Sequence, residues 1–121
     1  EKLVLLAPAA TLKSDALQGV CQGSTYDPMH IPSSVMVDGF KVGGDYFRTA
    51  QLLPIYETAQ HFDGPVLLIH GTADHVVSPE ASRKYHVILP QSELHLIDGE
   101  NHMLDGAHRP EIVKLVTDFL K

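Results

Sequence analysis

An aspartate and a histidine, which together can perform acid–base chemistry, lie in two separate short loops of the second half of the sequence. Asp74 follows the apolar run at 65–71, and His102 follows the next apolar run, at 93–99. A carboxylate beside an imidazole fixes the imidazole tautomer and stabilises its protonated form, so that the histidine can take a proton from a nucleophile. The alternative is that Asp74 caps a turn and His102 is a surface residue. The two loops together favour a catalytic pair.

Three apolar runs predict the strands that would position this pair, at 3–6, 65–71 and 93–99. Continuous apolarity is typical of strands covered on both faces, as in a parallel sheet. Helical spacing of apolar residues follows at 79–89, opened by Ser78-Pro79, and again from Pro110 to the end. Strand, helix, strand, helix in this order predicts an α/β fold with a parallel sheet.

The predicted topology gives the pair a common location. Asp74 and His102 follow the carboxyl ends of successive strands, the edge at which open α/β sheets bind ligands. Neighbouring strands lie about 4.8 Å apart, so the two loops can bring the side chains into contact.

Residues 11–61 interrupt the strand–helix alternation. A small hairpin is expected at 35–42, because Asp38-Gly39 supplies the positive φ angles of a tight two-residue turn. Helices are expected at 45–53 and, after Pro54, at 55–62. We therefore divide the chain into a core of residues 1–10 and 62–121 and an inserted cap of residues 11–61.

Composition narrows the class of protein. The 121 residues suffice for one domain, and 9 Lys and Arg against 15 Asp and Glu give a net charge of −6, which argues against nucleic acid as a partner. No apolar run approaches the roughly 20 residues of a membrane span, and the run at 3–6 is shorter than the core of a signal peptide. The single cysteine, Cys21, excludes an intrachain disulfide and fits a reducing compartment such as the cytoplasm. The eight histidines lack metal-ligand spacing, so no metal is expected.

The segment 65–77, which carries Asp74, and the segment 99–102, which carries His102, resemble the acid and histidine loops of the α/β-hydrolases. The order acid, then histidine, is also that of this superfamily. With the stretches 3–10 and 46–56, essentially the whole chain resembles the C-terminal half of bacterial cinnamoyl (feruloyl) esterases. The resemblance implies that Asp74 and His102 are two members of a catalytic triad, and that the fold is the C-terminal half of an α/β-hydrolase parallel sheet with an inserted cap containing a small hairpin and helices.

The nucleophile of such a triad is absent from the sequence. No Gly-x-Ser-x-Gly motif occurs, so the nucleophile and the oxyanion hole are expected in a missing N-terminal half of the same fold, and the chain alone is expected to be inactive. Gly-Val-Cys-Gln-Gly at 19–23 has the form of such a motif with Cys21 as nucleophile. It lies inside the expected cap and follows a helical segment instead of a strand, so we do not assign Cys21 this role.

The resemblance also implies which residues bind substrate. By position, Asp15, Gln22 and Tyr46 match the substrate-contacting Asp, Gln and Tyr of the cinnamoyl esterases, where the cap closes over the aromatic acyl group. Carboxylate, amide and phenol groups can all hydrogen-bond to the hydroxyls of such a ring. Without the resemblance, the same residues would be interpreted as a helix N-terminal Asp, a solvated Gln and a core Tyr.

The sequence therefore predicts part of a serine carboxylesterase that acts on hydroxycinnamoyl esters, with a small aromatic ester as substrate and no cofactor. A lipase-like or peptidase-like hydrolase shares the same loops and is an alternative. A non-catalytic module that binds a small aromatic ligand or a partner is another. The sequence leaves open whether the chain forms a homo-oligomer.

Overall fold

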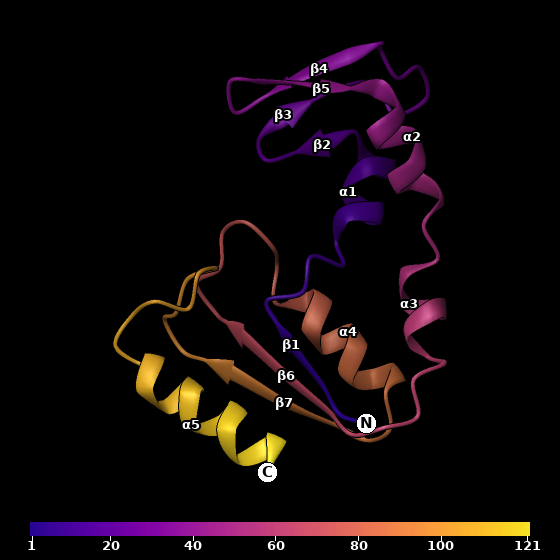
Figure 1. Ribbon diagram of the computed structural model, residues 1–121. Coiled ribbons are helices and arrows are strands. Elements are labelled where there is room, and N and C mark those ends of the chain that lie inside the picture. The colour runs from indigo at the N-terminus through magenta and orange to yellow at the C-terminus, as the bar shows by residue number, and fades with distance from the viewer. The chain divides into compact units, whose positions relative to one another are not determined.

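The computed structural model describes all residues, Glu1–Lys121, and divides into two compact units. The sheet unit comprises Glu1–Ala10 and Tyr56–Lys121, and the hairpin unit comprises Thr11–Ile55. Figure 1 shows the elements of both units. The longest helix has 12 residues, and none of the helices has the length and hydropathy that crossing a bilayer requires.

A three-stranded parallel sheet forms the centre of the sheet unit. Its strands are β1 (Leu3–Leu6), β6 (Val66–Gly71) and β7 (Ser92–Ile97), in the order β1-β6-β7. Leu3 is aligned with Val66 in one pair of strands, and Gly71 with Ile97 in the other. Every residue of β6 is buried, because this strand has a neighbour on each side and a helix on each face. The α/β class and the parallel sheet predicted from the apolar runs are confirmed.

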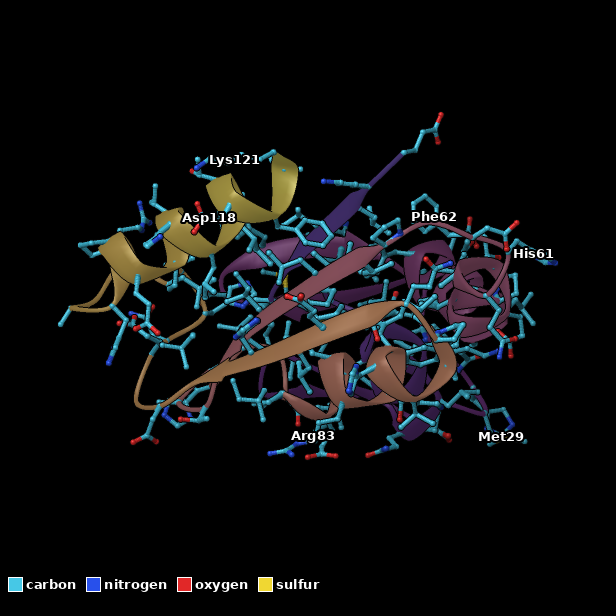
Figure 2. All side chains as sticks on the ribbon, turned by 90° about the horizontal axis from the view of Figure 1, so that it is seen from below. Met29, His61, Phe62, Arg83, Asp118 and Lys121 are labelled. Carbon is cyan, nitrogen blue, oxygen red and sulfur yellow. The ribbon has the colours of Figure 1, made fainter.

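Two helices cover opposite faces of this sheet: α4 (Glu80–Ile88) and α5 (Arg109–Leu120). Figure 2 shows them on either side of β6 and β7. Leu67 and Ile69 of β6 pack with Ile112 of α5. Successive strand residues point to opposite faces, so Leu68 and His70 face α4. The buried His70 of β6 therefore points toward helix α4.

The C-terminus of α5 is tied to the start of the chain. Nζ of Lys2 donates to the carbonyl oxygens of Phe119 and Lys121, at 2.7 and 2.8 Å. These carbonyls have no partner within the helix, and a cation suits the negative end of the helix dipole. On α5 itself, Asp118 pairs with Lys121 at 3.3 Å, and Figure 2 labels both residues.

Helix α3 (Ile55–Ala59) marks the boundary between the two units. Tyr56 packs against Tyr85 of α4, with ring centroids 4.8 Å apart, and Nζ of Lys84 lies 4.4 Å from the centre of the Tyr56 ring. These contacts attach Tyr56 and the residues after it to the sheet unit. The compact hairpin unit therefore ends at Ile55, and an inserted cap over residues 11–61 remains a prediction.

The hairpin unit holds the remaining elements: α1 (Leu12–Gln18), β2 (Val20–Cys21), β3 (Ser24–Thr25), β4 (Ser34–Val37), β5 (Phe40–Gly43) and α2 (Gly44–Leu52). The β4–β5 hairpin turns at Asp38 and Gly39, whose φ angles of 50° and 82° are those expected of this dipeptide. A small core of Val35, Val37 and Phe47 joins this hairpin to α2.

The β2–β3 hairpin was not predicted. Its strands have two residues each, too few for an apolar period to show in the sequence. Its turn lies at Gln22 and Gly23, both with positive φ (46° and 87°). Gln22 is therefore an exposed turn residue.

Candidate active site

The loops after β6 and β7 are bound to each other through the backbone. The amide of Thr72 donates to the carbonyl of Ile97, and the amide of Ala73 donates to the carbonyl of Glu100, both at 3.0 Å. A side chain at Gly71 would put its Cβ 2.2 Å from the Glu100 carbonyl oxygen, so only glycine allows this approach. The two loops therefore have one fixed arrangement.

This arrangement brings Asp74 and His102 together. Nδ1 of His102 lies 2.8 Å from Oδ2 of Asp74, and the amides of Val76 and Val77 donate to Oδ1 at 2.9 and 2.8 Å. The Asp74 side chain is fully buried, whereas that of His102 is 31% exposed. Burial by itself would raise the pKa of Asp74, but the Val77 amide, His102 and the Val76 amide outweigh it and lower that pKa. Asp74 is thus held as a carboxylate.

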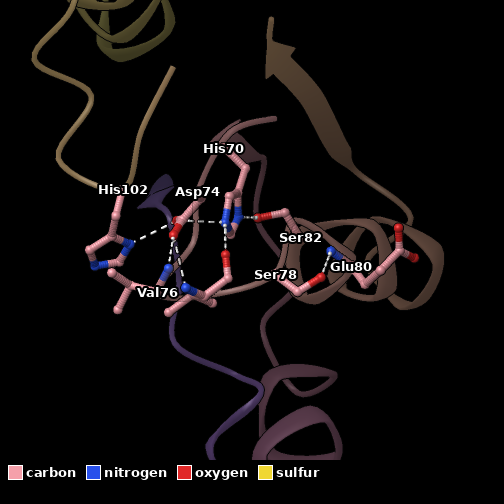
Figure 3. Close-up of polar contacts among 8 residues, drawn as sticks. His70, Asp74, Val76, Ser78, Glu80, Ser82 and His102 are labelled. Atoms are coloured by element: carbon pink, nitrogen blue, oxygen red, sulfur yellow. Dashed lines mark hydrogen bonds and ion pairs between the residues drawn. The ribbon is translucent and has the colours of Figure 1, made fainter. Parts of the chain in front are cut away.

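The tautomer of His102 follows from its partner. An ionised carboxylate only accepts hydrogen bonds, so Nδ1 of His102 carries the hydrogen and Nε2 of the neutral ring has a free lone pair. No side chain or backbone group bonds to Nε2, and Figure 3 shows it on the side of the ring that points away from Asp74. The ring is therefore arranged to accept a proton at Nε2.

His70 is a second imidazole on the same carboxylate. Its Nε2 lies 3.0 Å from Oδ2 of Asp74 and 3.0 Å from the carbonyl oxygen of Val77, and its Nδ1 lies 2.7 Å from Oγ of Ser82. No motif in the sequence predicted this contact. The available signal was a histidine inside an otherwise aliphatic strand, because a buried polar side chain needs partners.

Glu100 is the second functional residue that sequence analysis missed. Its carboxylate is buried and closes the loop that carries His102: Oε1 accepts from the amide and Nδ1 of His108, both at 2.9 Å, and Oε2 accepts from the amide of Gly106 at 3.0 Å. The His108 amide is the largest of the contacts that lower the pKa of Glu100. No motif marked this residue, since its partners lie six and eight positions along a loop.

A cavity of about 440 Å³ adjoins His102 within the sheet unit. It is lined by Leu6, His102, Met103, Leu104, Arg109, Ile112, Val113, Val116 and Thr117. Apart from His102, Arg109 and Thr117 these side chains are apolar, so the cavity suits an apolar group.

The three residues expected to bind substrate lie in different parts of the hairpin unit. Tyr46 is exposed on α2 and lines a cavity of about 360 Å³ with residues of α1, of α2 and of the segment after α2. Asp15 is half-buried on α1, and Gln22 is exposed in the β2–β3 turn; neither lines this cavity. No hydrogen bond joins the side chains of Asp15, Gln22 and Tyr46, and their role in binding remains a prediction.

Cys21 has the wrong surroundings for a nucleophile. Burial raises the pKa of its thiol, and the negative charge of Asp15 raises it further. A reactive cysteine needs the opposite, a lowered pKa that yields thiolate at neutral pH. The structure contains no group of three or more His, Cys, Asp or Glu side chains that could hold a metal ion.

Comparisons with known proteins identify solved structures with a similar fold. No family model and no curated protein sequence matches the chain. Among solved structures, Est1E from Butyrivibrio proteoclasticus matches 98% of the chain with a TM-score of 0.90 and 32% identity, and the same protein with ferulic acid bound matches equally well. A monoacylglycerol lipase from Paleococcus ferrophilus shares the fold, with a TM-score of 0.58 and 19% identity over 98% of the chain and 58% of the lipase.

The fold and the comparisons together define the class: the chain has the α/β-hydrolase fold. Among proteins of that fold it resembles the cinnamoyl (feruloyl) esterases. The chain spans about half of Est1E, 49% of its length in one structure and 48% in the other.

Proposed function

We propose that the chain supplies the acid and the base of a serine carboxylesterase that hydrolyses hydroxycinnamoyl esters. One observation carries the proposal: the 2.8 Å hydrogen bond between Asp74 and His102 at the carboxyl edge of a parallel sheet, with Nε2 of His102 unbonded. This is the geometry that a general base needs.

In the proposed reaction, Nε2 of His102 takes the proton of a serine hydroxyl as its oxygen attacks the ester carbonyl. Asp74 stabilises the resulting imidazolium through Nδ1. His102 then gives this proton to the departing alcohol, which leaves an acyl-enzyme. In the second half, His102 takes a proton from water, the hydroxide attacks the acyl-enzyme, and the proton returns to the serine. The serine and the oxyanion hole come from residues outside these 121, because the sequence holds no Gly-x-Ser-x-Gly motif.

The acyl group of the proposed substrate is a hydroxycinnamate. The likeness to Est1E, which has been seen with ferulic acid bound, supports this choice. We propose that Asp15, Gln22 and Tyr46 bind the substituted ring, and the cavity beside Tyr46 supports that role for Tyr46. A phenolic hydroxyl would find in them both hydrogen-bond donors and acceptors.

The test is ester hydrolysis with and without the missing nucleophile. The 121-residue chain alone is expected to leave methyl ferulate unhydrolysed, whereas a full-length protein that contains it should hydrolyse methyl ferulate faster than a long-chain acyl ester or a peptide. His102→Ala should abolish this activity, and His95→Ala, a strand histidine away from Asp74, is the matched control. Hydrolysis by the isolated chain that depends on His102, or preference for the long-chain ester, would contradict the proposal.

The apolar cavity beside His102 supports a second candidate, a module that binds a small apolar ligand without chemistry. Titration with ferulic acid separates the two. Binding that His102→Ala and Asp74→Asn leave intact, in a full-length protein without esterase activity, would favour the binding module.

A further inference from the structure

His70 is fully buried, touches the proposed catalytic carboxylate and takes no part in the proton transfers described above. We infer that His70 is a positioning residue, which shares Oδ2 of Asp74 with His102 and thereby limits the negative charge that Asp74 offers to His102. This inference deepens the proposed function and rests on it for its effect on catalysis. The contact itself can be tested without any ester hydrolysis.

The surroundings of His70 determine which of its nitrogens carries hydrogen. Nε2 lies 3.0 Å from two atoms that accept, Oδ2 of Asp74 and the carbonyl oxygen of Val77. A carbonyl oxygen cannot donate, so Nε2 bears a hydrogen and shares it between the two acceptors. The Ser82 hydroxyl, 2.7 Å away, then donates to Nδ1 of the neutral ring. Both ring nitrogens are thus engaged, and the ring has one orientation.

The backbone of Val77 bonds to both Asp74 and His70. Its amide donates to Oδ1 of Asp74 at 2.8 Å, while its carbonyl accepts from Nε2 of His70. The carboxylate is therefore clamped between a backbone segment and an imidazole, as Figure 3 shows. Ser82 connects the clamp to α4, where its side chain has no exposure. The position of Asp74 depends in this way on helix α4 as well as on its own loop.

The carboxylate of Asp74 has a full set of donors. The Val76 and Val77 amides bond to Oδ1, and the two imidazoles bond to Oδ2. A carboxylate has about four acceptor positions, so none is left over. His70 and His102 are the only titratable side chains that hydrogen-bond to it. Removing the His70 donor would concentrate charge on Oδ2, strengthen its bond to His102, and make the His102 imidazole more basic.

The experiment follows His102 by NMR of the imidazole nitrogens in the labelled 121-residue chain. The variants are His70→Leu, which removes all three hydrogen-bonding contacts of the ring; His70→Gln, whose amide can still donate to Asp74; and Ser82→Ala, which removes the donor to Nδ1. Ser92→Ala is the matched control, because Ser92 pairs with Nδ1 of His86 at the same 2.7 Å, away from Asp74. Circular dichroism verifies that each variant is folded.

His70→Leu should raise the titration midpoint of His102 by roughly half to one pH unit, the equivalent of one net hydrogen bond. Ser82→Ala should give a smaller shift in the same direction, and His70→Gln should stay near the wild-type value, as should Ser92→Ala. If His70→Leu does not fold, Ser82→Ala and His70→Gln still decide the question. An unchanged midpoint in His70→Leu or, failing that variant, in Ser82→Ala would overturn the inference, and so would a shift in His70→Gln as large as that in His70→Leu.

The same spectra separate this inference from the proposed function. If Nδ1 of wild-type His102 shows no bond to Asp74, the catalytic pair fails, whatever His70 does. If the bond is present but insensitive to His70, only the positioning role fails. In a full-length active enzyme, the acidic limb of the pH profile of kcat/KM should move upward with His70→Leu by the same fraction of a pH unit as His102 itself.

Discussion

The loop that carries Asp74 and the loop that contains Glu100 each hold a buried carboxylate, and they do so in nearly the same way. Each buries a carboxylate, each satisfies it with two backbone amides, and each adds Nδ1 of a histidine, at 2.8 Å for His102 and 2.9 Å for His108. Both carboxyl groups have a lowered pKa. In number of contacts they differ only by the additional hydrogen bond that Nε2 of His70 makes to Asp74.

The difference lies in what each carboxylate connects. The side-chain bonds of Glu100 stay within one loop, to Gly106 and His108, so they fix the path of that loop. Those of Asp74 reach β6 through His70 and the loop after β7 through His102. Separate strands thus bring Asp74 and His102 to the edge at which parallel sheets bind ligands, and for this reason we propose a catalytic role for Asp74 and not for Glu100.

The largest expected effect distinguishes the two carboxylates by activity. Asp74→Asn should lower kcat/KM for methyl ferulate by roughly 10³- to 10⁴-fold in a full-length enzyme, because an amide no longer fixes the His102 tautomer or stabilises its charge. The rates are measured by release of ferulic acid. Glu100→Gln should cost far less activity, and a loss of similar size in both variants would erase the distinction.

The next effect is on stability, where the two carboxylates should be alike. Glu100→Gln should lower the urea midpoint of unfolding, since the new NH2 group faces donors of Gly106 or His108 and cannot accept from them. Glu93→Gln is the matched control, because Glu93 makes only an exposed 3.4 Å contact with His95. Equal midpoints for Glu100→Gln and Glu93→Gln would show that the loop does not depend on this clamp.

Acidification should reduce the stability that the Asp74 and Glu100 carboxylates contribute to the folded state. A carboxyl group whose pKa is lowered by folding stabilises the folded state fully above its ordinary value, 3.8 for Asp74 and 4.5 for Glu100, and loses that contribution as the pH falls through the folded value. Urea midpoints should therefore be constant from pH 7 to about 5 and fall below that. A double variant, Asp74→Asn with Glu100→Gln, should show a flatter fall; the same slope as wild type would remove these two groups as its source.

The smallest effect concerns substrate choice. Asp15→Ala should weaken hydrolysis of methyl ferulate by about 2- to 10-fold relative to a short acyl ester, the equivalent of one hydrogen bond to the ring. The ratio of the two kcat/KM values is the measurement, with Asp27→Ala, a largely exposed carboxylate of the same unit outside the cavity beside Tyr46, as control. An equal loss on both esters would exclude Asp15 from the substrate site.

The hairpin unit was harder to predict from the sequence than the sheet unit. Asp38-Gly39 marks its turn by the backbone angles that it favours, and the β4–β5 hairpin follows. The β2–β3 hairpin gave no such signal, and the boundary at Ile55 depends on Tyr56 packing against Tyr85, a contact between residues far apart in the chain. The sequence did not reveal the parts played by His70 and Glu100 for the same reason, because these depend on hydrogen-bond partners that only the fold brings together.

The sequence by itself determined the three apolar strands, their parallel arrangement, and the edge of the sheet at which Asp74 and His102 lie. Local periodicity and the handedness of strand–helix–strand connections suffice for that. Only the tertiary structure decided that Asp74 accepts four hydrogen bonds and that His70 and His102 both bond to its Oδ2 atom. It also decided that Glu100 fixes the loop that carries His102. Hydrogen bonds depend on tenths of an ångström and on direction, and these are set by the packing of helices and loops, which no pattern of residue types records.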